Sequence, residues 1–360
     1  MITSIYFDVP HTYYIPQYAP VIKLLQTLNV DCHVMLYHGN DDELKNTAAS
    51  ELGLSIHWAH SESDALQHYS NALPNWVIFG NNFDALNSLP KKVKTALLFH
   101  GSGTGVKSAS LSPNLANFDV RFVSGPGRLK IFKQHYPNVN MFEVGFAKLD
   151  PLRKPETLKQ TQLDLQALGL SDKKKTILYA PTFYPSSIEN MSRHFPADFS
   201  EYNILIKPHD FTLHKKKYGH QLKKLNSWKN ADNVYLASSL EYSLVPFMAS
   251  ADLMITDTSS AIFEFTSLDK PVVICDFPHL RWSYRGPFKY RLKKRLDQST
   301  EHYQQVAAKA SNYKHLKSCV VEHMNNPTLL QDLRLKYSKE IMGNTDGNAS
   351  QRIVDLLINN

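Results

Sequence analysis

Short apolar runs rich in β-branched and aromatic residues alternate with amphipathic segments in the first part of the chain. The alternation has the periods expected of buried strands and of helices with one apolar face. The predicted strands are 3–7, 32–37, 54–58, 76–79, 96–99, 120–123 and 141–144, and the clearest helices are 20–28, 41–52, 63–69 and 129–135. Strands that alternate with helices predict a parallel sheet covered by helices.

The pattern breaks between Leu149 and Lys175, where the chain is polar and has no strand-like run. A second alternating series follows, with predicted strands at 176–180, 202–206, 234–236, 253–256 and 272–275. From about residue 300 the pattern is helical to the end. Because a single core rarely grows beyond ~250–300 residues, a chain of 360 residues predicts two domains.

We therefore expect an α/β protein with two Rossmann-like domains, formed by residues 1–150 and 151–360. The second would include the closing C-terminal helices. Ligands of such folds bind at the carboxyl ends of parallel strands. The expected architecture accordingly has two parallel sheets that face a central cleft.

Composition narrows the class of protein. Cys32, Cys275 and Cys319 are far apart, which fits reduced thiols and gives no metal-ligand spacing. No apolar run approaches ~18 residues and no secretory signal is visible, so we expect a cytoplasmic protein. The net charge of +7 favours anionic partners.

Basic and aromatic residues alternate in the segment 281–295. Such a mixture can rest on an anionic membrane surface or on nucleic acid, although a solvated loop is the default interpretation. The chain has no helix-turn-helix, RNA-recognition or zinc-finger signature, so we expect no nucleic-acid partner.

A strand-to-helix turn carries the clearest binding chemistry. Between the predicted strand 253–256 and an apolar helical segment lie Asp257, Thr258, Ser259 and Ser260. Side-chain oxygens and backbone N–H groups at a helix start can hold phosphate. Glu264 lies one helical turn further, where a carboxylate could reach ribose hydroxyls. Helix capping alone is the alternative interpretation.

Three other predicted strands end in residues with useful chemistry. His100 follows the strand 96–99 and precedes a glycine-rich loop, the exposed position that a general base needs. Thr182 follows Pro181, which ends the strand ladder. Lys207 and His209 emerge together from the strand 202–206 and suit the neutralisation of a departing diphosphate. A structural role remains open for each.

Taken in order, these motifs resemble the CDP-glycerol glycerophosphotransferase family of teichoic-acid and capsule synthesis. The resemblance covers residues 95–277 and rests on four sequences, which are His-Gly at 100–101, Ile-Leu-Tyr-Ala-Pro-Thr at 177–182, Lys-Pro-His at 207–209, and Ala-Asp-Leu-Met-Ile-Thr-Asp-Thr-Ser-Ser at 251–260 with Phe-Glu to 264. It implies a GT-B arrangement in which the first domain binds the acceptor and the second binds the nucleotide donor.

The resemblance also implies roles for single residues. His100 would be the general base that activates an acceptor hydroxyl, and His209 would stabilise the donor diphosphate. The remaining donor-binding candidates are Thr182, Lys207, Asp257, Thr258, Ser259, Ser260 and Glu264. The acceptor-side candidates are His11, Tyr13, Gly101 and Lys107.

The chain departs from the family pattern in several places. Phe183 and Tyr184 stand where Trp-Arg is common, so one expected phosphate contact is missing. The loop after His100 is longer by two residues if Lys107 is the matching lysine, and Thr258 stands where tyrosine is usual. These differences favour the transferase class over any particular donor.

The predicted reaction is a single displacement. It moves glycerol phosphate, or a related polyol phosphate, from a CDP-activated donor to a hydroxyl of a cell-surface polymer or lipid-linked glycan. It needs no metal and no other cofactor, and a peripheral position at the inner face of the cell membrane would suit it. Three alternatives remain, which are a GT-B glycosyltransferase that uses a nucleotide sugar, a UDP-sugar 2-epimerase and a non-enzymatic surface-binding protein.

Overall fold

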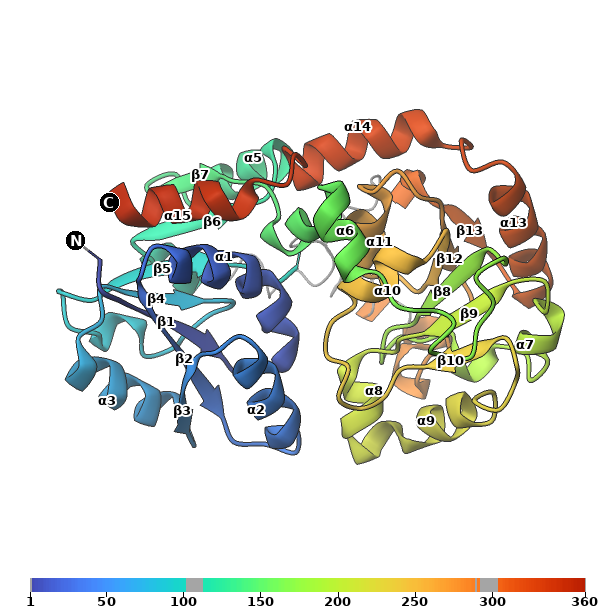
Figure 1. Ribbon diagram of the computed structural model, residues 1–360, viewed down its shortest axis with the longest axis horizontal. Helices are drawn as coiled ribbons and strands as arrows, with labels where there is room; N and C mark the ends of the chain where they lie inside the picture. The colour runs from blue at the N-terminus through green and yellow to red at the C-terminus, as the bar shows by residue number, and fades with distance from the viewer. Residues whose placement is uncertain (1, 102–112, 289, 292–303, 360) are drawn as a thin grey trace. The chain divides into compact units, whose positions relative to one another are not determined.

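The computed structural model describes residues 2–101, 113–288, 290–291 and 304–359 (Figure 1). The chain forms two compact units. Among the described residues, the first unit contains 2–101, 113–157 and 339–359, and the second contains 158–288, 290–291 and 304–338. Lys107, an acceptor-side candidate, lies outside the described residues.

The first unit is built on a parallel sheet, which among the described residues has seven strands in the order β3-β2-β1-β4-β5-β6-β7. The register places Ile5 beside Cys32 on one side and Trp76 on the other. The strands are β1 (Ser4–Val9), β2 (Asp31–Tyr37), β3 (Ser55–Ala59), β4 (Trp76–Phe79), β5 (Lys94–Leu98), β6 (Val120–Val123) and β7 (Met141–Glu143).

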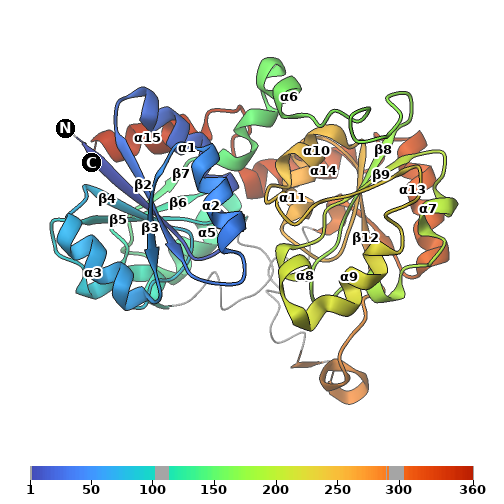
Figure 2. The same cartoon turned by 60° about the horizontal axis from the view of Figure 1, so that its bottom comes forward.

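Helices cover both faces of this sheet (Figures 1 and 2). They are α1 (Ile15–Thr27), α2 (Asp42–Glu51), α3 (Glu62–Ala72), α5 (Pro126–His135) and α15 (Ala349–Asn359). Short 3-10 helices are η1 (Thr12–Tyr14), η2 (Leu86–Ser88), η3 (Pro113–Asn117) and η4 (Ala147–Leu152). Burial on both faces explains why the strands are apolar along their length rather than alternating.

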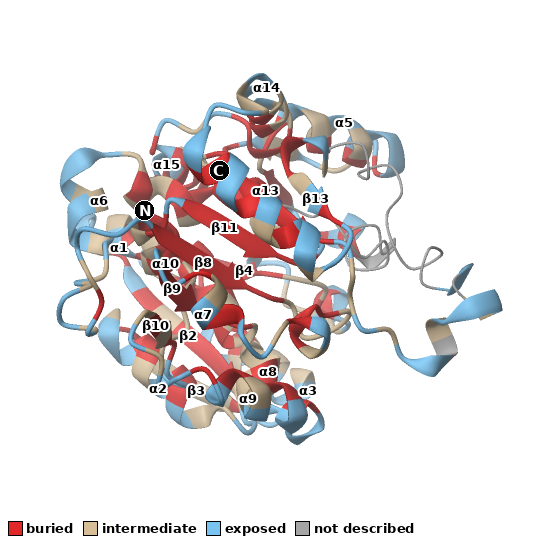
Figure 3. Cartoon of the chain, turned by 90° about the vertical axis from the view of Figure 1, so that its right-hand side faces the viewer, coloured by how far each residue is buried: buried red, intermediate tan, exposed pale blue. Residues whose placement is uncertain are grey.

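The second unit has a parallel sheet of six strands among its described residues, in the order β10-β9-β8-β11-β12-β13. Its strands are β8 (Thr176–Ala180), β9 (Asn203–Ile206), β10 (Val234–Leu236), β11 (Leu253–Thr256), β12 (Val272–Cys275) and β13 (Ala308–Ala310). Strands β8 and β11 are buried along their whole length, as is β4 of the first unit (Figure 3).

The helical elements of the second unit are shorter. They are α7 (Phe195–Asp198), α8 (Asp210–His214), α9 (Gly219–Asn226), α10 (Val245–Ser250), α11 (Ala261–Thr266) and α13 (Tyr313–Asn325), with η5 (Ile188–Asn190), η6 (Lys216–Tyr218), η7 (Trp282–Tyr284) and η8 (Gly286–Phe288). Two helices connect the units, α6 (Pro155–Thr161) and α14 (Gln331–Met342).

The C-terminal segment differs from the expected domain division. Residues 339–359 belong to the first unit rather than to a domain formed by 151–360, and the first unit extends to Thr157. Helix α15 packs against α1, and both carboxylate oxygens of Asp150 accept backbone hydrogen bonds at its start, from Ala349 (3.2 Å) and Ser350 (2.7 Å). Local hydrophobic patterning does not reveal such a return, because the contacts are distant in sequence.

Strand β13 is a second difference, because the sequence pattern predicted only helices after about residue 300. The strand is the short sequence Ala-Lys-Ala and pairs with β12 through Val273 and Ala308. Three residues without a large apolar side chain carry no strand period.

The predicted fold class, α/β with two parallel sheets and a helical C-terminus, is confirmed. Each sheet reverses its strand order once, between β1 and β4 in the first unit and between β8 and β11 in the second. Ligands of open α/β sheets bind outside the carboxyl ends of strands at such switch points. The candidate residues after β8 and β11 follow this rule, and His100 follows β5, two strands from β1.

Candidate active site

His100 is fixed by the end of the neighbouring strand. Its Nδ1 atom lies 3.2 Å from the carbonyl oxygen of Gly80, the residue after β4. Since a carbonyl oxygen can only accept, Nδ1 must carry the proton in this contact. In the neutral ring Nε2 therefore holds the lone pair, which is the form that a general base requires.

Aromatic rings surround His100 on the side of η1. Tyr14 stacks on the imidazole with ring centroids 4.3 Å apart and an interplanar angle of 10°, and the ring of Tyr13 lies 4.9 Å away. His11 stacks on Tyr13 at 5.1 Å. The structure thus places the acceptor-side candidates His11 and Tyr13 next to the candidate base His100.

Gly80 makes this arrangement possible. A Cβ atom at this position would lie 2.5 Å from Cδ2 of Tyr14 and 2.8 Å from the hydroxyl of Tyr18. Only glycine leaves room for both tyrosines next to the carbonyl group that fixes His100. Sequence reasoning missed Gly80, although a glycine directly after an apolar run is a recognisable signal of close approach.

Asp8 lies at the carboxyl end of β1 and was also missed. Its carboxylate is buried and accepts hydrogen bonds from the hydroxyls of Tyr37 (2.7 Å) and Tyr69 (2.8 Å). Burial raises the pKa of Asp8 to about 7, against the lowering effect of those two bonds. The hydroxyl of Tyr18 donates to the Asp8 carbonyl oxygen at 3.3 Å. Asp8 therefore binds the hydroxyl groups of three tyrosines.

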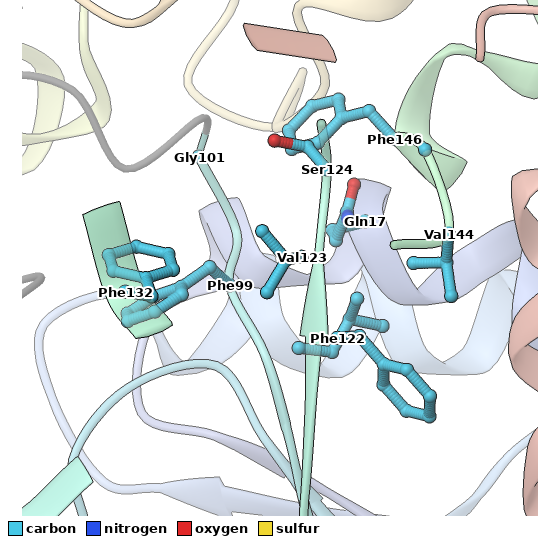
Figure 4. Close-up of a pocket in the computed structure, with 11 residues that line it drawn as sticks. Gln17, Phe99, Gly101, Phe122, Val123, Ser124, Phe132, Val144 and Phe146 are labelled. Carbon is cyan, nitrogen blue, oxygen red and sulfur yellow. The ribbon is translucent and has the colours of Figure 1, made fainter. Parts of the chain in front are cut away.

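The lining of a pocket in the first unit includes Gly101, the residue after His100 (Figure 4). The pocket encloses about 310 Å³ of empty space, open solvent included. Its lining consists of Gln17, Leu98, Phe99, Gly101, Phe122, Val123, Ser124, Phe132, Val144, Gly145 and Phe146. The lining thus combines phenylalanine side chains with the polar side chains of Gln17 and Ser124.

Asp257 is the central buried group of the second unit. It is 2% exposed, and its two carboxylate oxygens accept hydrogen bonds from the backbone N–H groups of Thr182 and Ser187, both at 2.9 Å. Burial raises its pKa to about 7, although these hydrogen bonds oppose the shift. The alternative interpretation, helix capping, is therefore not what this carboxylate does, because its two oxygens accept from the loop after β8.

Phe183, in the loop after β8, packs against the imidazole ring of His209. The ring of Phe183 lies edge-on to the imidazole at 4.7 Å, and Phe211 lies at 4.9 Å. The side chain of Gln221 donates to the carbonyl oxygen of Phe183 at 3.1 Å and accepts from the hydroxyl of Thr212 at 3.1 Å. Asp257 and Gln221 thus hold the loop from two sides, and Gln221 was not recognised from sequence.

The protonation of His209 is the reverse of that of His100. Its Nδ1 atom accepts the backbone N–H of Phe211 at 3.1 Å. Since an amide nitrogen can only donate, Nδ1 must be unprotonated and Nε2 carries the proton in the neutral ring. His209 therefore presents a hydrogen-bond donor rather than a base.

The polar groups of Lys207 and Thr182 bind other groups of the protein. The Lys207 ammonium is 4% exposed and pairs with the Asp210 carboxylate at 3.0 Å. The Thr182 hydroxyl donates to the carbonyl oxygen of Pro185 and to Asp257 at 3.4 Å. Both residues stand at the predicted strand ends, but their polar groups organise the loops there.

The hydroxyl-rich turn after β11 has the predicted order of strand and helix. Thr258 is exposed, Ser259 and Ser260 are half-buried, and Ser259 Oγ accepts the backbone N–H of Ala261 at 3.1 Å. Ser260 is the N-cap residue but makes no capping hydrogen bond with its side chain. Glu264 is 2% exposed, so its predicted contact with a ribose would require this side chain to become accessible.

The described residues contain neither a membrane-spanning helix nor a metal-binding cluster. No helix there is long and apolar enough to cross a membrane. No group of three or more His, Cys, Asp or Glu side chains there has an arrangement suited to a metal ion. The three cysteines are buried and unpaired.

Two Rossmann-like units, each with candidate residues after its parallel strands, define a GT-B-like α/β protein. Solved structures with this fold include the wall teichoic acid polymerase TagF, with a TM-score of 0.71, 14% identity and coverage of 99% of this chain and 88% of that chain. A TagF variant soaked with CDPG has a TM-score of 0.67 at 15% identity and the same coverage.

A UDP-GlcNAc 2-epimerase from Neisseria meningitidis, bound to UDP-GlcNAc, has a TM-score of 0.62 at 16% identity with full coverage of both chains. At these identities the similarity shows the fold alone. Family membership comes from sequence, because the CDP-Glycerol:Poly(glycerophosphate) glycerophosphotransferase family matches residues 100–359. The protein belongs to this family.

Curated relatives are teichoic acid primases. The ribitol-phosphate primase of Bacillus spizizenii is 28% identical over 164 residues, which are 44% of this chain and 41% of the relative. The glycerol-phosphate primase of Bacillus subtilis is 23% identical over 255 residues, which are 68% of this chain and 58% of the relative. The chain spans about half the length of these two relatives.

Proposed function

We propose that the protein transfers glycerol phosphate, or a related polyol phosphate, from a CDP-activated donor to a hydroxyl group of a polymer or lipid-linked glycan. Family membership supports the reaction class. The observation that carries the proposal is the opposite partner of the two Nδ1 atoms, a carbonyl oxygen at His100 and a backbone N–H at His209, from which we infer one base and one hydrogen-bond donor.

In this reaction the acceptor hydroxyl attacks the β-phosphorus of CDP-glycerol. His100 Nε2 takes the hydroxyl proton as the new P–O bond forms, and the bond between the β-phosphorus and the CMP oxygen breaks. His209 Nε2–H donates to a phosphate oxygen that gains charge as CMP departs. The first unit would handle the acceptor and the second unit the donor.

The other donor contacts belong to this proposal as well. Thr258, Ser259 and Ser260 would receive phosphate, and Glu264 would hold the ribose. Asp257 and Thr182 would act through the loop after β8, since their polar groups bind one another there. Lys207 would contribute positive charge from its ion pair with Asp210.

Turnover of defined substrates tests the reaction. Purified protein is incubated with CDP-glycerol and a synthetic poly(glycerophosphate) oligomer, and CMP release and oligomer extension are measured with and without EDTA. We expect both signals, dependent on the oligomer and unchanged by EDTA. Transfer from a nucleotide sugar instead, isomerisation of a UDP-sugar without acceptor, or activity that EDTA abolishes and a divalent ion restores would each contradict the proposal.

We also propose that the protein contacts an anionic membrane surface through the basic and aromatic segment after β12. Trp282 is 76% exposed and Tyr290 is 59% exposed, and the Arg291 guanidinium lies 4.7 Å from the Phe288 ring. Exposed aromatic rings next to arginines suit a lipid interface. Flotation with phosphatidylglycerol liposomes at low salt tests this, and a protein that stays at the bottom of the gradient would refute it.

A further inference from the structure

Two cations flank the aromatic cluster that holds His209. The cluster contains Phe183, Phe211 and Tyr218, whose ring lies 5.5 Å from Phe183. The Lys215 ammonium lies 3.4 Å from the centroid of the Phe211 ring. The Arg281 guanidinium lies 4.0 Å from the ring of Tyr184, the residue after Phe183.

Arg281 is held by more than its contact with this ring. Its backbone N–H donates to the hydroxyl of Tyr184 at 3.2 Å, and its guanidinium donates to the hydroxyl of Tyr218 at 3.4 Å. The backbone N–H of His279 donates to the carbonyl oxygen of Ser186 at 2.6 Å, which ties the same segment to the loop after β8. Arg281 is exposed, but these contacts hold its guanidinium beside the cluster, where it stays accessible to a ligand.

No acidic side chain of the described residues forms an ion pair with these two cations, Lys215 and Arg281. The acidic side chains of this region have other partners, since Asp210 pairs with Lys207 and Glu189 with His220, each at 3.0 Å. Cations that rest on aromatic rings and form no such ion pair attract an anion.

We propose that Arg281 and Lys215 form an anion subsite beside His209 that binds a phosphate ester. A guanidinium group matches the paired oxygens of phosphate, and an ammonium group adds a point charge. The phosphate belongs either to the nucleoside diphosphate of the donor or to a phosphodiester of the acceptor chain. The subsite deepens the proposed function and rests on it for these two sources of phosphate.

The subsite divides the basic segment after β12 into two parts. Arg281 contacts Tyr184 and Tyr218 at the cluster, whereas the next residue, Trp282, is 76% exposed. Phosphate recognition by Arg281 is therefore separable from membrane contact by Trp282. A substitution at one position should leave the function of the other intact.

Calorimetric titration tests the subsite. CDP and a poly(glycerophosphate) oligomer are titrated separately into the wild-type protein, Arg281→Gln, Lys215→Gln and the double variant. Lys229→Gln, which removes an exposed lysine after α9 in the same unit, is the control for net charge. We expect each subsite substitution to weaken binding of one ligand by about tenfold, as for the loss of one charge-assisted contact, and the control to change it less than twofold.

The titrations also distinguish the two sources of phosphate. A loss confined to CDP assigns the subsite to the donor, and a loss confined to the oligomer assigns it to the acceptor chain. Unchanged binding of both ligands by the double variant, a loss no larger than the control's, or no binding of either ligand by the wild-type protein would overturn the subsite. Thermal melts establish that each variant is folded.

The proposed reaction and the subsite can fail separately. Binding that depends on Arg281, in a protein that releases no CMP from CDP-glycerol, would retain the subsite and reject the reaction. Transfer activity together with unchanged ligand binding in the double variant would retain the reaction and reject the subsite. A further variant, Tyr184→Leu, removes the ring beneath Arg281 and should weaken the same ligand as Arg281→Gln.

Discussion

Each unit has a candidate histidine after a parallel strand, but the two histidines carry the ring proton on different nitrogens. His100 and His209 each follow a parallel strand and each pack against aromatic rings. In the first unit the partner of Nδ1 is the carbonyl oxygen of Gly80, and in the second it is the N–H of Phe211. The backbone group that contacts Nδ1 thus decides whether Nε2 holds a lone pair, as in His100, or a proton, as in His209.

A second contrast concerns a buried aspartate in each sheet. Each sheet has a buried aspartate on or after a strand that borders the reversal of strand order, Asp8 on β1 and Asp257 after β11. Burial raises the pKa of each carboxyl group to about 7. Asp8 is held by two tyrosine hydroxyls, whereas Asp257 is held by two backbone N–H groups. Hydroxyl groups can reverse their hydrogen bonds and backbone N–H groups cannot.

The largest expected effect comes from removing the base. His100→Ala should lower kcat for transfer from CDP-glycerol by about 10²–10⁴-fold, the usual contribution of a general base. Affinity for CDP should not change, since CDP contacts are assigned to the second unit. His135→Ala, at an exposed histidine of the same unit, is the matched control, and normal turnover in His100→Ala would remove the base from the account.

Glutamine substitutions sharpen the contrast between the two histidines. A glutamine amide can donate a hydrogen bond but cannot act as a base at neutral pH. His209→Ala should lower kcat by about 10²–10³-fold, as for loss of one donor to developing charge. His209→Gln should recover at least tenfold of this loss, and His100→Gln should recover nothing relative to His100→Ala.

Equal behaviour of the two glutamine variants would contradict the assigned roles. The readout is kcat at saturating CDP-glycerol, so that differences in donor affinity do not enter. Thermal melts of all four variants exclude a common loss of folded protein.

Asparagine substitutions separate the two aspartates. Asp257→Asn turns an amide NH₂ toward Thr182 or Ser187 and leaves one buried backbone N–H without an acceptor, at a cost of about 1–3 kcal/mol. In Asp8→Asn a tyrosine hydroxyl can rotate and accept from the amide. We therefore expect Asp257→Asn to lower the free energy of unfolding by about 1–3 kcal/mol more than Asp8→Asn.

Urea titration at pH 8 measures this difference. Equal losses in the two variants would show that the kind of donor does not matter. A larger loss in Asp8→Asn would reverse the contrast.

A further expected effect is a pH dependence of stability. The pKa of Asp257 is about 7 in the folded protein and near 3.8 as its ordinary value, so the folded state binds more protons between these pH values. The contribution of Asp257 to stability therefore falls as pH rises from about 4 to about 7. The difference in unfolding free energy between the wild-type protein and Asp257→Asn should shrink over this window.

Urea titrations at half-unit steps of pH follow that difference. A difference that grows with pH would mean that hydrogen bonding outweighs burial and holds the folded-state pKa of Asp257 below its ordinary value. Asp8→Asn is the parallel case in the first unit, because burial raises the pKa of Asp8 to about 7 as well.

Strand positions could be predicted from the sequence because a strand buried on both faces leaves a continuous apolar run. Strands β4, β6, β8, β10, β11 and β12 match the predicted ranges residue for residue. Strand β13 could not be predicted in this way because Ala-Lys-Ala has no such run. The return of α15 to the first unit depends on contacts such as Asp150 with Ser350, which lie far apart in the sequence.

The positions of the candidate site residues could be predicted from the sequence, but their hydrogen-bond and packing partners could not. His100, Lys207, His209 and Asp257 stand at strand ends, as expected. The sequence does not show that Asp257 binds the loop after β8, because that choice depends on β8 and β11 being neighbours in the sheet. The contact of Arg281 with Tyr184 was hidden for the same reason, since it joins two loops.

The opposite protonation of His100 and His209 is the central claim, and long-range ¹⁵N–¹H correlation NMR tests it most directly. Spectra of ¹⁵N-histidine-labelled protein are recorded at alkaline pH, where the imidazole rings are neutral, and His100→Ala and His209→Ala assign the signals. We predict a protonated Nδ1 for His100 and a protonated Nε2 for His209. The same tautomer at both positions, or the reverse assignment, would contradict the account.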